Sequence, residues 1–150
     1  MEHGEYEKNY YGTSLSAIEA VVQSGKICVL NLHVHSIMIL RQGSAGAKLK
    51  PYFVFVSPPT QMDKLSRLID STTAADGSGP GHHYQHHHAR MSTSDLQSII
   101  EEARDIESRY GHYFDMILTV TDIDRAYVEL LREINALERE PQWIPVSWLK

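Results

Sequence analysis

Apolar positions along the chain follow two spacings, and these spacings predict helices and strands in alternation. Five segments carry apolar residues at helical spacing: 15–22, 34–41, 62–69, 96–106 and 123–137. Three short apolar runs between them predict buried parallel strands: 26–32, 52–56 and 114–120. Alternation of this kind predicts an α/β fold, in which helices flank a parallel sheet.

Small and polar residues mark the expected ends of these elements. Ser94 and Gln97 resemble a capping box at the start of the fourth helix. Either Thr121 or Asp122 is expected to cap the last helix. Residues 43–47 hold two glycines and predict a flexible turn. In the last helix we expect one apolar stripe to face the core: Ile123, Tyr127, Leu130, Leu131, Ile134 and Leu137.

Residues 71–92 interrupt the alternation. This segment is rich in small and polar residues and has almost nothing to bury, so it predicts a disordered loop. It also holds five clustered histidines: His82, His83, His86, His87 and His88. Imidazole is a common zinc ligand, but the segment has no cysteine and little that would fix a geometry. We therefore expect weak, incidental metal affinity rather than a folded metal site.

Composition and charge narrow the classes of protein. The 150 residues are enough for one domain with a core, and the net charge of −5 argues against nucleic acid as a general partner. No apolar run reaches the length of a membrane span, and the acidic N-terminus does not resemble a signal peptide. Cys28, the single cysteine, cannot form an internal disulfide and is expected to be a structural thiol in a reducing compartment.

The stretch EHGEYEKNYYGTS, residues 2–14, concentrates side chains that suit a nucleotide. Tyrosine and threonine hydroxyls donate hydrogen bonds to a phosphate oxygen without carrying a charge. A carboxylate suits the paired N–H donors of a guanine edge, and Gly12 lets the backbone approach a ligand closely. The spacing also fits a short two-stranded ribbon with aromatic packing, so both interpretations stay open at this point.

The pattern E-x-x-x-[FY]-x-x-N-Y-Y-G-[ST] in this stretch resembles the nucleotide-monophosphate loop of guanylate kinases. The likeness continues through SLSAIEAVVQSGKICVLNL, and the end of the chain, from GHYFDMILTV to IPVSWLK, is similar to membrane-associated guanylate kinase scaffolds of the membrane-palmitoylated subfamily. The resemblance implies that Glu2 occupies the place of a base-recognising glutamate, Tyr11 that of a phosphate-contacting tyrosine and Thr13 that of a neighbouring hydroxyl. Together with Tyr6 and Gly12, these residues form the predicted binding site.

The resemblance also implies a division of the chain. Residues 1–139 would be a partial guanylate-kinase-like domain that lacks its first strand and phosphate loop, with 71–92 as a lid insertion. Residues 140–150 contain Pro141 and Pro145, which exclude a regular helix, and apolar side chains without an obvious partner. In the scaffold family the corresponding segment is a strand that completes a Src-homology 3 domain, so we expect an orphan strand here.

The sequence lacks most of the residues that phosphoryl transfer needs. A phosphate cradle needs G-x-x-x-x-G-K-[ST] between a strand and a helix, and the nearest run, 43–48, has the wrong spacing. The resemblance implies aspartates at the positions where this sequence has Asn31 and His33. An amide supplies no anionic charge to hold Mg²⁺. The lid region keeps only Arg67 at a family-like position, although lid arginines stabilise the transferring phosphoryl group.

These features predict a non-catalytic scaffold module without cofactor or metal. The resemblance implies binding to junctional or cell-polarity proteins, including phosphorylated peptides, at the cytoplasmic face of the plasma membrane. The alternative is a guanylate-kinase-type phosphotransferase, residual or completed by another segment. A histidine-dependent metal carrier is a third, weaker alternative.

Overall fold

The computed structural model describes residues 2–75 and 91–149, and these fall into two compact units. The first unit comprises residues 1–53 and 143–150, and the second comprises residues 54–142. The five histidines between 82 and 88 lie outside the described residues, as does most of the predicted lid.

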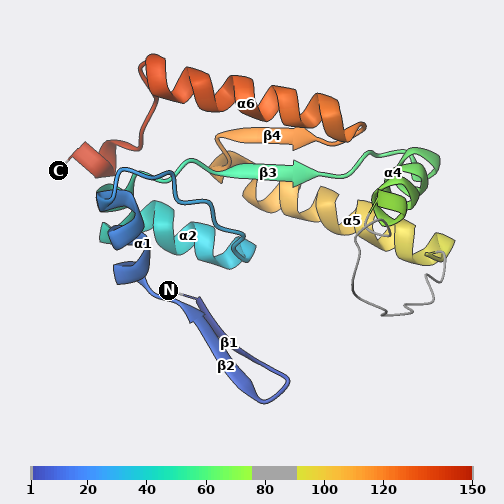
Figure 1. Cartoon of the computed structure of the whole chain (residues 1–150), viewed down its shortest axis with the longest axis horizontal. Helices are drawn as coiled ribbons and strands as arrows, with labels where there is room; N and C mark the ends of the chain where they lie inside the picture. Colours follow the sequence, from blue (N-terminus) through green and yellow to red (C-terminus); the bar gives the residue numbers. More distant parts are fainter. Residues whose placement is uncertain (1, 76–90, 150) are drawn as a thin grey trace. The chain divides into compact units, whose positions relative to one another are not determined.

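The first unit begins with an antiparallel hairpin and continues into three helices (Figure 1). Its elements are β1 (Glu2–Tyr6), β2 (Asn9–Thr13), α1 (Leu15–Gln23), α2 (Val34–Gln42), α3 (Ser44–Leu49) and the 3-10 helix η3 (Val146–Leu149). Its buried apolar side chains are Ile18, Ile37, Leu40, Phe53 and Trp148. The hairpin and the first two helices confirm the predictions from local spacing, because each depends on neighbours in sequence.

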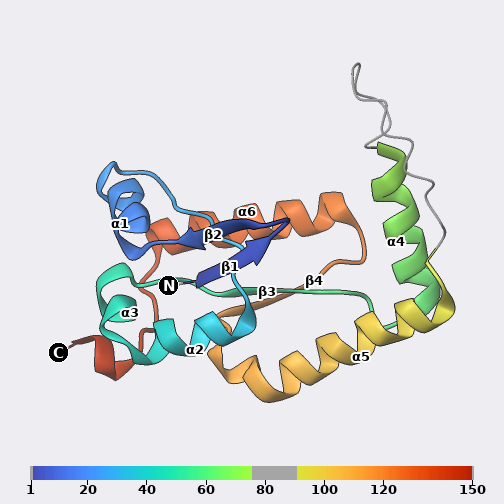
Figure 2. The ribbon, with the colours of Figure 1, turned by 90° about the horizontal axis from the view of Figure 1, so that it is seen from below.

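The second unit is built on two parallel strands, β3 (Val54–Ser57) and β4 (Met116–Thr119). The strands lie between α5 (Thr93–Tyr110) and α6 (Ile123–Arg139) in two perpendicular views (Figures 1 and 2). The remaining elements are α4 (Met62–Ala75) and the 3-10 helix η2 (Gly111–Tyr113). Leu65, Leu96 and Ile100 form a buried cluster, against which Ile69 and Ile99 pack. This small parallel sheet with flanking helices confirms the predicted α/β class.

The predicted strand at 26–32 is wrong for this structure. These residues have no regular secondary structure, and their apolar side chains are not buried: Ile27 is 67% exposed and Val29 86% exposed. A strand needs a neighbour that accepts and donates its backbone hydrogen bonds. Among the described residues, β3 pairs only with β4 and β1 only with β2, so 26–32 has no such neighbour.

The turn predicted at 43–47 is a helix instead, because α3 spans Ser44–Leu49. Gly46 lies buried within it against the Leu40 carbonyl, where a side chain would not fit. Residues 71–75, predicted to be part of a disordered loop, continue α4 instead, and residues 76–90 of that predicted loop lie outside the described residues. In both segments a helix already started by packing overrides weak local propensity.

The cap of α5 differs from the predicted one by two residues. Ser92 is the N-cap: its Oγ accepts a hydrogen bond of 3.2 Å from the Asp95 amide, and Asp95 Oδ2 accepts one of 3.2 Å from the Ser92 amide. Gln97 instead donates to Glu101 Oε1 at 2.6 Å. The predicted alternative for α6 is resolved in favour of Asp122, whose Oδ1 accepts from the Arg125 amide at 2.9 Å.

The inward stripe predicted for α6 is only partly correct. Leu130, Ile134 and Leu137 are half-buried, but three other members are exposed: Ile123, Tyr127 and Leu131. Ala126, absent from the prediction, is the buried residue of the helix. The buried face of α6 therefore differs from the predicted one, and apolar side chains remain on its outer face.

The C-terminal segment has a partner within its own unit, contrary to the expectation. Trp148 is 7% exposed, and its Nε1 donates a hydrogen bond of 3.2 Å to the Arg41 carbonyl. The Arg41 guanidinium lies 4.7 Å from the centre of the Phe53 ring and 5.4 Å from that of Trp148. In this structure Val146–Leu149 is a 3-10 helix and not a strand, while completion of a Src-homology 3 domain stays a prediction.

Candidate functional site

The candidate site is the β1–β2 hairpin, which turns through only two residues. Glu7 and Lys8 both have positive φ, 49° and 66°, as a type I′ turn requires. Asn9 supports the turn through its side-chain amide, which donates a hydrogen bond of 3.2 Å to the Glu7 carbonyl. This turn type matches the right-handed twist of the strands and fixes the register of the pair.

The register decides which residues share a face of the hairpin. Glu2 pairs with Thr13, Gly4 with Tyr11 and Tyr6 with Asn9. Because successive positions of a strand alternate between faces, these pairs belong to one face. Four of the five predicted site positions are thus brought together: Glu2, Tyr6, Tyr11 and Thr13.

Gly12, the fifth predicted position, pairs with His3 on the opposite face. It therefore does not line the same surface as the other four. Tyr10 pairs with Glu5 on that opposite face and is 87% exposed. A glycine here keeps side-chain bulk off the strand but contributes no group to the predicted site.

Tyr11 occupies the middle of the site face. Its ring lies over Gly4, so that a Cβ built on Gly4 would be 2.5 Å from Tyr11 Cζ. The side chain nevertheless remains 58% exposed. Both interpretations of the tyrosines thus describe part of this arrangement, because one flank of the ring packs on the ribbon while the rest stays accessible.

Gly4 was not among the predicted site residues. The signal that could have identified it is the register itself, since a two-residue turn at Glu7-Lys8 places Gly4 opposite Tyr11. Gly12 was the glycine predicted to let the backbone approach a ligand closely. In the structure the close contact is at Gly4, against the Tyr11 ring.

The hairpin leads directly into α1. Ser14 is the N-cap of that helix, and its Oγ accepts a hydrogen bond of 3.2 Å from the Ala17 amide. Thr13, the last residue of β2, is half-buried beside this cap. A capped helix start at the end of β2 limits how the base of the hairpin can move.

The run 43–48, which approached a phosphate cradle in sequence, has no free loop in the structure. The Gly46 amide donates to the Gly43 carbonyl at 3.1 Å, inside a helix rather than toward a ligand. Lys48 Nζ lies 2.7 Å from Glu19 Oε1, in an ion pair between α3 and α1. A P-loop, in contrast, keeps its amides and lysine available for phosphates.

Asn31 and His33, at the places of family aspartates, precede α2. His33 caps this helix, with its Nδ1 accepting from the His35 amide at 3.4 Å, and the two rings stack with centres 4.9 Å apart. Within residues 2–75 and 91–149, no group of three or more His, Cys, Asp or Glu side chains could hold a metal ion. None of the helices in these ranges is long and apolar enough to cross a membrane.

Comparison with known proteins decides the family. The guanylate kinase family matches residues 1–77, which include the whole hairpin and α1–α4. The chain belongs to the membrane-associated guanylate kinases. It is 43% identical over 150 residues, all of this chain, to Protein PALS1 of Danio rerio.

Two further relatives confirm this placement. The chain is 38% identical over 149 residues to MAGUK p55 subfamily member 2 of Rattus norvegicus, and 33% identical over 149 residues to Protein PALS2 of Homo sapiens. Each alignment covers 99% of the chain. The chain spans only a fraction of these relatives, 19% of PALS1, 24% of the p55 member and 25% of PALS2. The chain therefore corresponds to the guanylate-kinase-like part of these longer relatives.

Proposed function

We propose that this segment binds partner proteins and does not transfer phosphoryl groups. The observation that carries the proposal is the hairpin register, which puts positions 2, 11 and 13 on one face, where the Tyr11 side chain is 58% exposed. These groups can recognise a phosphate or a carboxamide through hydrogen bonds, but they supply no positive charge. A surface of this kind is suited to binding and not to stabilising a transferring phosphoryl group, which needs cations.

The rest of the described chain supports the same proposal. Lys48 is paired with Glu19 within helical structure, and Arg67 lies 3.8 Å from Asp63 on its own helix. Asn31 has an amide at the position where the resemblance to guanylate kinases implies a metal-binding carboxylate. Losing one transition-state donor lowers a rate by about 10²–10³. Several such losses together would leave no useful turnover.

The partners that fit this face are proteins with a phosphorylated residue. A phosphoserine or phosphothreonine presents oxygens that accept hydrogen bonds from Tyr11 and Thr13. The relatives include MAGUK p55 subfamily member 2 and Protein PALS1, and from that relationship we infer a scaffold role with junctional or cell-polarity partners beneath the plasma membrane. A Src-homology 3 domain in the same polypeptide is the proposed intramolecular partner of residues 140–150.

A binding titration separates the site face from the rest of the hairpin. The probe is a phosphoserine peptide followed by NMR, with its unphosphorylated form as the reference. Tyr11→Phe removes one hydroxyl donor to a charged group and should weaken binding about tenfold. The matched control is Tyr10→Phe, which removes the same hydroxyl from the opposite face and should leave binding unchanged. Equal effects of the two substitutions would argue against the site face.

A second measurement tests the absence of catalysis. A coupled assay with GMP, ATP and Mg²⁺ on the full 150-residue chain should show no turnover above background. Ordinary kinases turn over at about 1–100 s⁻¹. A rate in that range would reject the binding-only proposal and support the alternative of a guanylate-kinase-type enzyme.

A further inference from the structure

The outer face of α6 carries apolar side chains that no element of its unit covers. Val128 is 64% exposed, Tyr127 60%, Ile123 47% and Leu131 39%. A residue in an α-helix advances about 100° around the axis. On that geometry Val128 and Leu131 lie on the side opposite Ala126, the residue that α6 buries.

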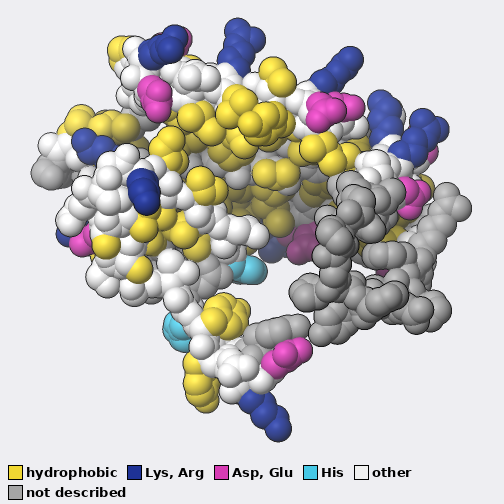
Figure 3. All heavy atoms as spheres, in the orientation of Figure 1, with side chains coloured by type: hydrophobic (Ala, Val, Ile, Leu, Met, Phe, Trp, Pro, Cys, Tyr) yellow, Lys and Arg dark blue, Asp and Glu magenta, His cyan; other side chains and the backbone are white. Residues whose placement is uncertain are grey.

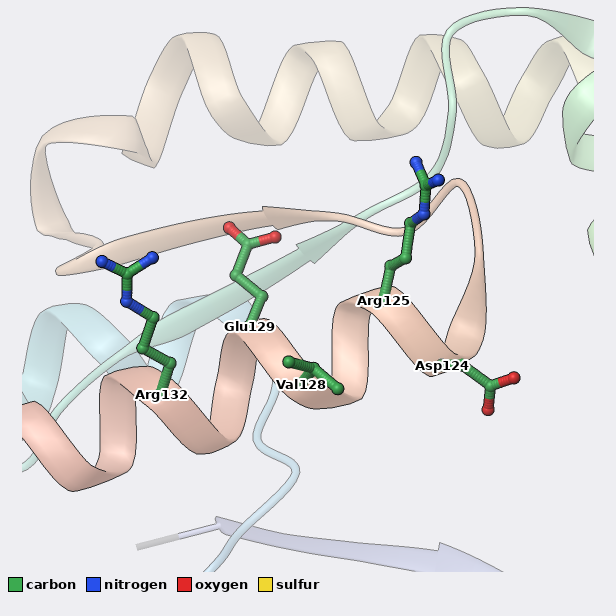
Figure 4. A pocket seen from close by; sticks show the side chains of 5 residues that line it. All are labelled: Asp124, Arg125, Val128, Glu129 and Arg132. Atoms are coloured by element: carbon green, nitrogen blue, oxygen red, sulfur yellow. The ribbon is translucent and has the colours of Figure 1, made fainter.

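Arginines border this apolar strip at regular intervals. Arg125, Arg132 and Arg139 recur every seventh residue, which places them on one side of the helix about 10.5 Å apart. Figure 4 shows Arg125 and Arg132 extending from the same side of α6, with Val128 and Glu129 between them. Figure 3 shows hydrophobic side chains along α6 and the strands beside it, with Lys and Arg side chains projecting at the upper edge.

The side chains form a shallow groove. Its volume is about 550 Å³, and its lining residues come from α6 alone: Asp124, Arg125, Val128, Glu129 and Arg132. The apolar part of the groove is provided by Val128, and the arginines stand at its two ends (Figure 4). An apolar strip with charges at its border is the usual design of a helix-docking surface.

The groove arginines differ from two other arginines of the same unit, Arg109 and Arg67. Arg109 Nε lies 2.8 Å from Asp105 Oδ1 on α5, and Arg67 is paired with Asp63 on α4. Arg125 and Arg132 have no carboxylate within ion-pair distance among the described residues, although Glu129 is one helical turn from Arg125. Their guanidinium groups thus remain available for bidentate contacts with carboxylates from another molecule.

We propose that the outer face of α6 docks an acidic amphipathic helix of a partner protein. The partner would lay apolar side chains on Val128 and Leu131 and direct carboxylates spaced one heptad apart at Arg125 and Arg132. Charge complementarity selects this occupant. An anionic membrane surface fits less well, because Asp124 and Glu129 alternate with the arginines along the groove. A helix can place its carboxylates opposite the arginines alone, whereas a bilayer surface presents negative charge to all four side chains.

The site is distinct from the hairpin that carries the proposed function. It uses side chains of α6 only and recognises carboxylates on a helix, whereas the hairpin is proposed to recognise a phosphorylated residue. Loss of one activity therefore need not accompany loss of the other.

The test is a titration of the full 150-residue chain with a designed 21-residue helical peptide. One face of the peptide carries Leu and Ile, and glutamates at seven-residue spacing flank it. A second peptide has lysine in place of every glutamate. Fluorescence anisotropy should show binding of the glutamate peptide at least tenfold tighter than that of the lysine peptide, and the difference should shrink at high salt.

Charge reversal on α6 provides the decisive comparison. Arg125→Glu with Arg132→Glu should weaken the glutamate peptide at least tenfold and make the lysine peptide the better ligand. Both positions are exposed, and a glutamate at position 125, in the first turn of α6, interacts favourably with the helix dipole, so the variant should remain folded, as circular dichroism will show. The matched control is Arg104→Glu with Lys64→Glu, which makes the same change in net charge on exposed positions of α5 and α4. Its effect should stay below twofold.

Three results would overturn the proposal. One is equal binding of both peptides to the wild-type chain. Another is binding to phosphatidylserine vesicles, but not to the peptide, that depends on Arg125 and Arg132. The third is a dimer of this chain, seen by analytical ultracentrifugation, that Val128→Ser dissociates and that excludes the peptide. Weaker peptide binding in Val128→Ser without any change in oligomeric state would support it, because Val128 is the apolar part of the groove.

Discussion

The phenol ring of Tyr11 lies against Gly4, its partner across the β1–β2 pair. Glycine is the residue that allows this arrangement, because a Cβ at position 4 would be 2.5 Å from Tyr11 Cζ and 2.8 Å from Cε1. Non-bonded carbon atoms pack at about 3.5–4.0 Å, so a side chain at position 4 must displace the ring. The accessible edge of Tyr11 is thus positioned by the absence of a side chain on the neighbouring strand.

Gly4→Ala should therefore act through Tyr11. We expect the ring to rotate off the ribbon and binding of a phosphoserine peptide to weaken at least as much as in Tyr11→Phe, about tenfold. NMR shifts of the Tyr11 ring protons will report the movement, and titration will report the affinity. The control is His3→Ala, at the adjacent position on the opposite face, which should change neither quantity. Unchanged ring shifts in Gly4→Ala would contradict the packing argument.

The hairpin turn offers a gain of stability. Glu7 and Lys8 both adopt positive φ, a conformation that asparagine and glycine reach at lower free energy than glutamate and lysine do. Glu7→Asn with Lys8→Gly should stabilise the hairpin by about 1 kcal/mol. Hydrogen exchange of the β1 and β2 amides measures this directly. Lys8→Pro should destabilise the hairpin, since proline cannot reach a φ of 66°.

Much of the fold follows from local spacing in the sequence. The hairpin, α1, α2, α5 and both strands of the second unit depend on side chains a few residues apart, and each is found close to its expected range. The parallel direction of β3 and β4 agrees with the prediction from their apolar runs, whereas the pairing of these two strands with each other was not predicted. The membership of the scaffold branch followed from the hairpin motif and the C-terminal segment.

The errors fall where structure depends on residues far away in the sequence. An apolar run at 26–32 predicts a strand, yet strand formation requires a partner that the run itself cannot specify. Gly46 suggested a turn, although its helix is held against Leu40 and Trp148. The face of α6 that is buried could not be predicted from the spacing, because apolar residues lie around most of the helix.

The register of the candidate site could not be predicted from its residue types alone. Hydroxyl and carboxylate chemistry pointed to residues 2–14, the resemblance to guanylate kinases singled out Glu2, Tyr11 and Thr13, and the register puts positions 2, 6, 11 and 13 on one face. The assignment of Gly12 to the same surface required knowledge of the turn length, since a shift of one residue exchanges the two faces. Their role in binding stays a prediction until the titrations are made.

The start of α5 allows the two candidate caps to be compared directly. Ser92→Ala removes the hydroxyl that accepts from the Asp95 amide and should destabilise the second unit by about 1 kcal/mol. Ser94→Ala removes a hydroxyl that lies 2.7 Å from Ser92 Oγ but accepts no backbone amide of the helix start, and it should change stability by less than about 0.5 kcal/mol. Thermal unfolding followed by circular dichroism measures both. A larger loss at Ser94 would favour the cap expected from the sequence over the one in the structure.

Gly46 and Trp148 should respond to substitution as one structural element. A Cβ at Gly46 would collide with the Leu40 carbonyl and lie 3.2 Å from Trp148 Cζ2, and a backbone carbonyl in α2 cannot move aside freely. Gly46→Ala should therefore destabilise the first unit by about 3 kcal/mol, the upper range for overpacking, and expel Trp148 from its site. In a Trp143→Phe background the tryptophan emission comes from Trp148 alone, so its exposure should shift the emission to longer wavelength.

Gly25 provides the matched control for this substitution. It has a positive φ of 77° and no atom within 4 Å of a built Cβ. Gly25→Ala should therefore cost about 1 kcal/mol through backbone strain alone, with no change in tryptophan emission. Because both variants add a single methyl group to a glycine, the difference between them isolates the packing of α3 on α2 and on Trp148. Similar emission spectra for the two variants would show that the C-terminal segment is held independently of Gly46.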